Sequence, residues 1–489
     1  MGSREPTLGA GELPRPDALN RAGMFLFQVD ATSYDPRNYL PESEAAKRVL
    51  PSFEKFSFPC ALIEILATDR QMNKNAENPY FVLMTAAGKQ PCDEFDRELH
   101  ALNRRLWNGW VFQNCNDAWK GKIRAEAELV PGFNLDDLAP LNSEENKLIE
   151  NALKERSNVN SVDPDPANIE ISGIRYINSL NCCGYIFKEQ LSIKDSSFEC
   201  FVTFSTCIFF NRLSFARCEF RKYADFSNSR IHASADFHSA NFFDEADFGS
   251  TVFIGGASDF TQAQFHNIAD FKRTRFTIAR FNEAKFKDQA SFMRATFEDY
   301  CRFNECSFLK YAGFGKTKFK SSADFSFSEF GYKTNFTKSE FFESIDFSNT
   351  KFLGSTRFDS CNFYNQPPKY FESELHEDTT WKDISDWPVP QEPEDAEDFI
   401  LAYERLKLQM DRQKRTHEEH RFLRLELKCR RIAAPNTVAG YLSNFYESFS
   451  EYGWSIWRPI KVIFITTWSG WIFLFSSESV AELTGGDRL

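Results

Sequence analysis

The 489-residue sequence lacks the short motifs that mark the common catalytic sites. It contains no G-x-S-x-G, H-E-x-x-H, Walker A or G-x-G-x-x-G pattern. No group of carboxylates, histidines or nucleophiles has the spacing of a catalytic site. We therefore predict a protein that is not an enzyme and that holds no cofactor. A hydrolytic enzyme in the first third of the chain remains an alternative that no motif supports.

The sequence is also poor in features that bind metals or nucleic acids. It has 7 histidines, and its formal net charge of −12 argues against a protein that coats nucleic acid. His417 and His420 lie one helical turn apart, but no third ligand is evident, so we expect a solvated helix face and no metal. The 12 cysteines contain no paired C-x-x-C pattern and predict a reducing, intracellular compartment, not a disulfide framework.

The N-terminal third of the sequence shows no repeat. Residues 1–23 contain no apolar run, so we expect them to be disordered and not to form a signal peptide. Residues 24–160 alternate short apolar runs with helical patterns, which predicts a small α+β domain. Its predicted elements are strands at Met24–Val29, Ala61–Ala67 and Tyr80–Ala86 and helices at Asp93–Trp107 and Asn142–Arg156.

What the sequence has in abundance is phenylalanine, 53 in all, most of it in a regular repeat between positions 171 and 363. The marked positions alternate six and five residues apart. A fixed short period over this length predicts stacked structural units instead of an ordinary globular core. The predicted core of the repeat includes Phe226, Phe237, Phe248, Phe271, Phe292, Phe303, Phe325 and Phe347.

A small side chain precedes most of the marked phenylalanines by two positions, as Ala246 precedes Phe248 and Ala269 precedes Phe271. In extended backbone these two side chains point to the same side and the residue between them points to the other. Each unit therefore sends one large and one small apolar side chain inward. The intervening residue, often aspartate, points outward, where we expect it to bond backbone at a corner instead of acting in a catalytic pair.

Units of five or six residues fit the faces of a narrow coil. Four faces would close a coil of about 22 residues, and about nine coils stacked at the strand spacing would give a rod roughly 43 Å long. Two register faults interrupt the pattern. Phe253 to Phe260 spans seven residues with Gly255 and Gly256 inside, which predicts a bulge at a corner, and Phe276 to Phe281 spans five where six are due.

The strings ADFSNSRI, ADFHSANF, ADFGSTVF and ADFKRTRF resemble the pentapeptide-repeat family, A(D/N)(L/F)xx. The resemblance implies a right-handed quadrilateral β-helix, which we place at residues 169–365. The predicted fold is thus mainly β, with the small N-terminal α+β domain on one side and C-terminal α-helices on the other.

After the repeat, the pattern predicts a Pro-rich linker at residues 366–395 and two helices within residues 396–434. The first helix covers Ala396–Asp411. The second begins at Thr416, whose T-x-x-E sequence has the form of a capping box, and ends before Pro435. The pair is expected to form a helical hairpin or one long, kinked helix.

An apolar run at Ile456–Phe475, within the segment 440–476, predicts a membrane-associated or transmembrane helix followed by a tail at residues 477–489. Positive charges precede this run, which places the repeat in the cytoplasm under the positive-inside rule. A helix lying on the membrane surface and a packed soluble helix are the alternatives. The predicted anchor residues are Arg458, Pro459, Lys461, Trp468 and Trp471.

The stretch Tyr452–Pro459 is similar to the C-terminal part of bacterial pentapeptide-repeat proteins that carry a membrane segment. In that group it leads into a pair of transmembrane helices, as in two-helix ion channels. Here the given sequence has one apolar run and continues from it only to Leu489, so we expect the second helix of such a pair to be missing.

These observations predict a non-enzymatic interaction scaffold that is tethered to the cytoplasmic face of a bacterial membrane, with a purely cytosolic protein as second choice. The protein partner is unknown, and an oligomer is compatible with the sequence. One alternative is a DNA mimic that binds a topoisomerase, but residues 171–363 carry 22 acidic against 24 basic side chains and do not form an acidic rod. The other alternative is the remnant of a two-helix channel.

Overall fold

The computed structural model describes residues 77–91, 95–163, 168–384, 387–453 and 455–484, with side chains of the last helix described through Ile472. The chain divides into two units, Met1–Asn75 and Ala76–Leu489. All described residues belong to the second unit. The segment predicted to be disordered and the strands predicted at Met24–Val29 and Ala61–Ala67 lie outside the described residues.

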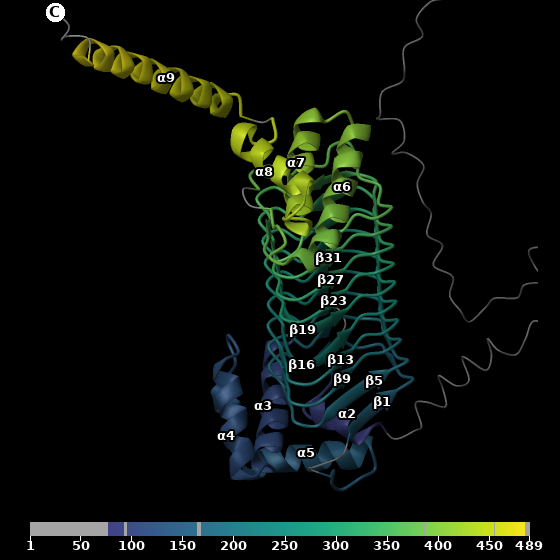
Figure 1. Ribbon diagram of the computed structural model, residues 1–489. Helices are drawn as coiled ribbons and strands as arrows, with labels where there is room; N and C mark the ends of the chain where they lie inside the picture. The colour runs from purple at the N-terminus through teal and green to yellow at the C-terminus, as the bar shows by residue number, and fades with distance from the viewer. Residues whose placement is uncertain (1–76, 92–94, 164–167, 385–386, 454, 485–489) are drawn as a thin grey trace, which may run out of the picture. The chain divides into compact units, whose positions relative to one another are not determined.

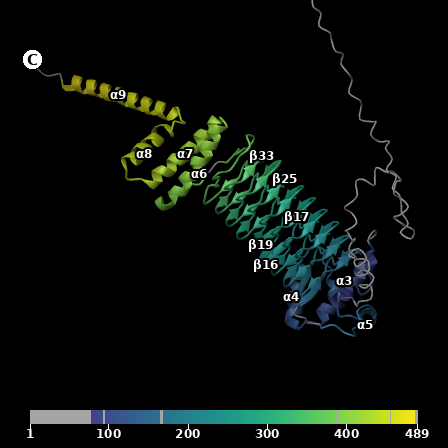
Figure 2. The same ribbon diagram turned by 90° about the vertical axis from the view of Figure 1, so that its right-hand side faces the viewer.

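Residues 168–363 form a parallel β-solenoid of about nine turns, which confirms the predicted fold class (Figures 1 and 2). Each strand pairs in parallel with the corresponding strand of the next coil, as Phe220 pairs with Phe242 and Ala246 with Ala269. The strands fall into two nine-stranded sheets and one sixteen-stranded sheet that covers two faces of the coil.

The first nine-stranded sheet contains β2 (Arg175–Tyr176), β6 (Ser197–Phe198), β10 (Glu219–Phe220), β14 (Asn241–Phe242), β17 (Gln264–Phe265), β20 (Lys285–Phe286), β24 (Ser307–Phe308), β28 (Glu329–Phe330) and β32 (Lys351–Phe352). The second contains β3 (Leu180–Asn181), β7 (Val202–Thr203), β11 (Ala224–Asp225), β15 (Ala246–Asp247), β18 (Ala269–Asp270), β21 (Ala290–Ser291), β25 (Tyr311–Gly313), β29 (Lys333–Asn335) and β33 (Ser355–Arg357).

The sixteen-stranded sheet contains β1 (Asn168–Ser172), β4 (Ile186–Phe187), β5 (Gln190–Lys194), β8 (Ile208–Phe209), β9 (Leu213–Ser214), β12 (Arg230–Ile231), β13 (Ala235–Asp236), β16 (Val252–Asp259), β19 (Arg275–Arg280), β22 (Thr296–Phe297), β23 (Cys301–Arg302), β26 (Lys318–Phe319), β27 (Ala323–Asp324), β30 (Glu340–Phe341), β31 (Ile345–Asp346) and β34 (Asn362–Phe363).

Phenylalanine rings fill the inside of the solenoid in columns. Phe248 and Phe271, one coil apart, stack with ring centroids 4.9 Å apart and an interplanar angle of 6°. Phe260 meets Phe248 edge-to-face at 5.2 Å and 89°. Each such pair adds about 0.5–1.5 kcal/mol to the free energy gained by burial. The eight phenylalanines predicted as repeat core lie in these columns with at most 1% of their surface exposed: Phe226, Phe237, Phe248, Phe271, Phe292, Phe303, Phe325 and Phe347.

The small residue two positions before a core side chain often carries a hydroxyl or thiol that bonds the coil before it. Thr251 Oγ1 donates to Phe226 O at 2.7 Å, and Thr274 Oγ1 donates to Phe248 O at 2.8 Å. Cys306 Sγ donates to Phe281 O at 2.8 Å, and burial raises the pKa of this thiol. Serine, threonine and cysteine are therefore accepted beside alanine because a carbonyl satisfies their polar atom.

The two register faults lie on neighbouring coils and match each other. β16 contains the seven-residue step and pairs with β19, which contains the five-residue step, and the register shifts between Phe253 and Ala257. Gly256 has φ +68°, and a Cβ on Gly255 would clash with His232 O. This confirms the predicted bulge. At this corner β16 and β19 run on without a turn, which joins two faces into one sheet.

The N-terminal part of the unit is helical over its described residues. Its elements are α2 (Pro79–Met84), α3 (Arg97–Gln113), α4 (Asp117–Glu128), the 3-10 helix η4 (Leu135–Leu138) and α5 (Ser143–Arg156). The prediction of a strand at Tyr80–Ala86 is wrong, because Asn78 caps a helix that has Pro79 in its first turn. The first predicted helix begins after Asp96 instead of at Asp93. Asn142 and Glu145 form a capping box that confirms the start of α5.

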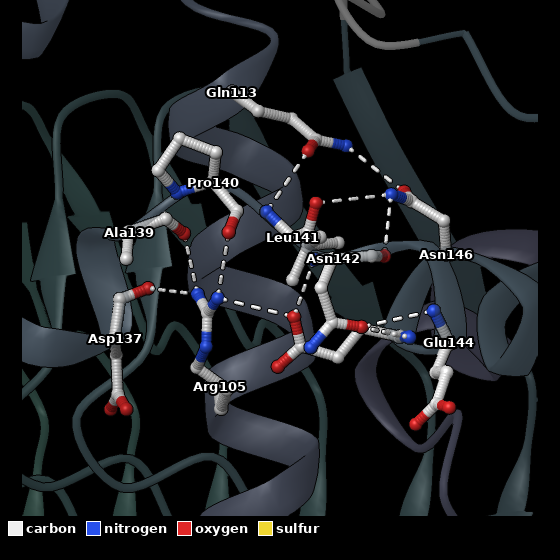
Figure 3. Close-up of polar contacts among 10 residues, drawn as sticks. Arg105, Gln113, Asp137, Ala139, Pro140, Leu141, Asn142, Glu144 and Asn146 are labelled. Carbon is white, nitrogen blue, oxygen red and sulfur yellow. Dashed lines mark hydrogen bonds and ion pairs between the residues drawn. The ribbon is translucent and has the colours of Figure 1, made fainter.

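Arg105 holds the loop before α5 against α3 (Figure 3). Its guanidinium donates to the carbonyl oxygens of Ala139 at 2.5 Å and Pro140 at 2.9 Å, and it pairs with Glu145 at 3.2 Å. A five-donor fork suits several carbonyls at once, so one side chain fixes the whole turn.

Helix α3 closes the first coil of the solenoid. Trp107 Nε1 donates to Ile186 O at 2.7 Å, while the Asn108 amide donates to Gly184 O at 2.9 Å and accepts from Ile186 N at 3.0 Å. These side chains replace the backbone partners that a preceding coil would supply. The cap thereby protects a sheet edge that would otherwise pair with another chain.

At the other end, the prediction of a linker over residues 366–395 is wrong for its first half. Parallel bridges join Lys369 to Asp346 and Thr380 to Arg357, so that residues 366–384 form one more, irregular coil. Aromatic side chains continue the core: Tyr370 stacks on Phe347 at 5.2 Å, Trp381 on Phe358 at 6.0 Å and Trp387 on Phe363 at 5.2 Å.

Two helices cover this last coil, α6 (Ala396–Arg412) and α7 (Thr416–Ala433), preceded by the 3-10 helix η5 (Pro393–Asp395). Of the two predicted arrangements, a helical hairpin or one long, kinked helix, the structure shows the hairpin. The capping box predicted at Thr416 is wrong, because Arg415 occupies the N-cap and its side chain makes no capping hydrogen bond. The segment predicted as one membrane helix forms two helices, α8 (Val438–Ser450) and α9 (Trp457–Thr484), the second of which extends into the predicted tail.

Candidate interaction surfaces

Phenylalanine rings fill the inside of the solenoid, so a ligand or partner would have to bind on its outer faces. The outward aspartates of the second sheet have a structural role there, as predicted. Asp225, Asp247 and Asp270 stand in register on successive coils. Each carboxylate accepts a hydrogen bond from the backbone N–H two residues on, at 2.7 to 2.9 Å. Burial raises the pKa of Asp247, and its two neighbours add to that effect.

An apolar surface lies at one corner near the C-terminal end of the solenoid. We call it the Leu309 corner; it contains Leu309, Tyr332 and Leu353, which are 49%, 70% and 49% exposed. Leu309 and Leu353 follow β24 and β32, which flank β28 on successive coils. A Cβ on Gly331 would lie 2.8 Å from Leu309 O, and one on Gly354 would clash with Tyr332 O. Only glycine allows the coils to approach this closely here.

The pattern of phenylalanines did not reveal this corner, because the position after a marked phenylalanine usually faces solvent with a polar side chain, as Arg221 and Lys287 do. Two leucines at that position, each with a glycine on a neighbouring coil, were the available signal. Exposed apolar side chains that stand together in this way are typical of protein interaction sites.

A second apolar surface belongs to helix α8, which exposes its apolar face to solvent and turns its polar face toward the rest of the protein. Val438, Tyr441, Leu442 and Phe445 follow the spacing of one helical face and are 64% to 76% exposed. The opposite face carries Glu447, which pairs with Arg431 and with Lys428 of α7, the latter at 3.6 Å. Surface helices normally bury their apolar stripe. In α8 the polar face contacts α7, and the apolar face is exposed and available for a binding partner.

Helix α9 follows α8 in the chain and also exposes apolar side chains. The predicted anchor residues Trp468 and Trp471 are 69% and 64% exposed, and Lys461 is exposed as well. Pro459 lies in the first turn of the helix. Arg458 instead turns back to α8, where it donates to Glu447 O at 3.1 Å and pairs with Glu451 at 3.4 Å.

The predicted transmembrane helix is not supported. Over the residues that the structure describes, no helix combines the length and the hydropathy that a bilayer crossing requires. Arg458 and Lys461 stand near the start of α9, and Thr466, Thr467 and Ser469 interrupt its apolar run. The side chains of Phe473–Phe475, which complete the predicted span, lie outside the described part.

The remaining candidate residues are scattered. His417 and His420 lie in the first turns of α7, and within the described part of the chain no cluster of three or more His, Cys, Asp or Glu could hold a metal ion. Among the described residues, nine cysteines carry free thiols, while Cys200 is disulfide-bonded. The free thiols are Cys115, Cys182, Cys183, Cys207, Cys218, Cys301, Cys306, Cys361 and Cys429.

Comparison with known proteins supports a single assignment. The solenoid matches the family described as pentapeptide repeats (9 copies) over residues 260–307. This match supports the pentapeptide-repeat family for that part of the solenoid, and the parallel pairing of successive coils shows the β-solenoid fold. No curated protein and no solved structure matches the chain significantly.

Proposed function

We propose that the protein is a non-enzymatic interaction scaffold whose solenoid presents a fixed outer surface to a protein partner. The observation that carries this proposal is the Leu309 corner. Its side chains are exposed, yet the coils beneath them cannot rearrange, because backbone hydrogen bonds tie Leu309, Gly331 and Leu353 to the preceding coils at 2.7 to 2.9 Å. A preformed apolar surface loses little conformational entropy on binding, which favours a protein partner.

The proposal is tested by capture of partners from a cell extract with the full chain and with a Leu309→Ser/Tyr332→Ser/Leu353→Ser variant. We expect proteins held by the full chain to be lost with the variant, while the variant keeps its melting temperature. A matched control, Lys285→Ser/Lys351→Ser on the adjoining sheet, should leave capture unchanged. Equal capture by all three proteins would contradict the scaffold role of this corner.

A second part of the proposal is that α8 and α9 hold the scaffold on a membrane surface, with the solenoid in the cytoplasm. Its support is the exposed apolar and aromatic surface of these helices, which is typical of helices that lie in the interface. We expect the full chain to float with membranes, to be released by carbonate, and to lose membrane binding when it ends before residue 440.

The alternative of a DNA mimic has less support. One outward column of the sixteen-stranded sheet runs from Asp236 and Asp259 to Arg280 and Arg302 before it returns to aspartate. Mimicry of a phosphate backbone needs continuous rows of negative charge.

A further inference from the structure

The side of α7 that meets α8 is a basic groove of about 310 Å³. Arg421, Arg424, Lys428 and Arg431 follow one another at three- and four-residue steps, so they share one face of the helix. Trp387, Val389, Leu425 and Ile432 form the apolar walls of the groove, and Glu447 is the carboxylate in its lining. We call this site the α7 groove.

The α7 groove holds more positive charge than its carboxylates neutralise. Glu447 serves both Arg431 and Lys428, and Glu451 is shared between Arg424 at 3.3 Å and Arg458 at 3.4 Å. Among the described residues, Glu447 and Glu451 thus each serve two cations, and Glu418, the carboxylate near Arg421, also pairs with Arg415 at 2.6 Å. Burial lowers the pKa of Arg421, and the neighbouring charge of Arg424 lowers it further. An anion in the groove would relieve this repulsion.

The apolar face of α8 lies on the side of that helix away from the groove, and only a short turn separates α8 from α9. A helix that faces clustered cations on one side and exposes aromatic and aliphatic side chains on the other matches the chemistry of an anionic membrane surface. A soluble phosphate compound would account for the cations but would leave the exposed face of α8 unexplained.

We propose that the α7 groove binds the phosphate of an anionic phospholipid while the apolar face of α8 and the first turns of α9 enter the headgroup region. Arginine binds phosphate oxygens through two parallel N–H groups, and lysine adds a point charge. This inference rests on the proposed membrane association and names the lipid class that the membrane must contain.

The test measures binding of the full chain to phosphatidylcholine vesicles and to vesicles in which phosphatidylglycerol replaces part of that lipid. We expect clear binding to the anionic vesicles and at least roughly tenfold weaker binding to the neutral ones. The Lys428→Gln/Arg431→Gln variant should bind the anionic vesicles at least about tenfold more weakly, because two cations near the surface are lost. Lys285→Gln/Lys351→Gln removes the same charge from the solenoid and should change binding little.

A substitution of opposite sign separates lipid binding from a purely structural role. Glu447→Gln removes the carboxylate that pairs with Lys428 and Arg431. Both cations are then available to lipid phosphate, so binding to anionic vesicles should become several-fold tighter. If the ion pairs only hold α8 in place, this variant will bind equally or more weakly, and the inference is wrong. Circular dichroism of each variant checks that the helices remain folded.

The other outcomes are equally decisive. No binding to either vesicle overturns the membrane association and this inference together. Equal binding to neutral and anionic vesicles overturns the inference alone and leaves the tether standing. If glycerol phosphate displaces the protein fully, while Leu442→Ser/Phe445→Ser leaves vesicle binding unchanged, the ligand is a soluble phosphate and the lipid assignment is wrong.

Discussion

The solenoid and helix α8 place the same kind of side chain on opposite sides of their backbones. In the solenoid, phenylalanines such as Phe271 are fully buried, and the residues between them face solvent. In α8, Phe445 is 66% exposed, and a charged residue, Glu447, faces the rest of the protein. Apolar burial therefore stabilises the solenoid, whereas α8 is held by ion pairs and offers its apolar surface to a partner.

The largest effect is expected where a charge enters the inside of the solenoid. Ala269→Arg forces a guanidinium into a slot that is closed on all sides, which should cost more than about 4 kcal/mol and unfold the solenoid cooperatively. Thermal unfolding followed by circular dichroism measures this. Gln264→Arg on the outward side of β17 is the control and should melt like the parent. An unchanged curve for Ala269→Arg would show that inside and outside have been exchanged.

The next effect tests whether the irregular coil at residues 366–384 belongs to the same cooperative unit. Trp381 is buried between Phe358 and Phe422, so Trp381→Ala should destabilise the protein by about 3–5 kcal/mol. Chemical denaturation gives this value directly. Trp468→Ala removes an exposed ring of the same size and should leave the midpoint unchanged. If Trp381→Ala and Trp468→Ala destabilise the protein equally, the buried coil at residues 366–384 and the exposed helix α9 do not differ in the way that we infer.

A smaller effect probes the hydroxyls inside the solenoid. Thr274→Val keeps the shape of the side chain but removes the hydrogen bond to Phe248 O, which should cost about 1 kcal/mol. Phe248 O still accepts from Thr251 N at 3.1 Å, so no carbonyl is orphaned. Thr296→Val on the outward side of β22 is the matched control. A loss above about 3 kcal/mol would mean that the packing, and not the hydrogen bond, had been disturbed.

The fold of the solenoid could be predicted because its inside and outside alternate along the sequence itself. Even the bulge at Gly255 and Gly256 appears as a change in the spacing of phenylalanines. The last coil was missed although its spacing continues, with Tyr370, Leu375, Trp381 and Trp387 at steps of seven, five, six and six after Phe363. The change from phenylalanine to other large side chains and the prolines at 367 and 368 hid it.

The candidate surfaces could be predicted far less well. α8 has a regular apolar face, and that pattern alone predicts burial, because amphipathic helices usually pack on a core. The apolar face is exposed because cations of α7 hold the opposite, polar face. These cations are far from α8 in the sequence and come close to it only in the folded chain. Similarly, α2 is a short apolar run that fits a strand as well as a helix. The hydrogen bonds of the N-cap residue Asn78 favour the helix.

The smallest expected effect completes the comparison. Phe445→Ser, with or without Leu442→Ser, should change the free energy of unfolding by less than about 0.5 kcal/mol, because the removed side chains are already in water. Phe271→Ser, the same exchange inside the solenoid, should cost about 3 kcal/mol or more. Denaturant titration of both variants measures the pair side by side. The α8 variant should also self-associate less in sedimentation experiments, since it removes exposed apolar surface. A strongly destabilised Phe445→Ser would mean that α8 buries this face in solution, and the surface assigned to the membrane would then belong to the core.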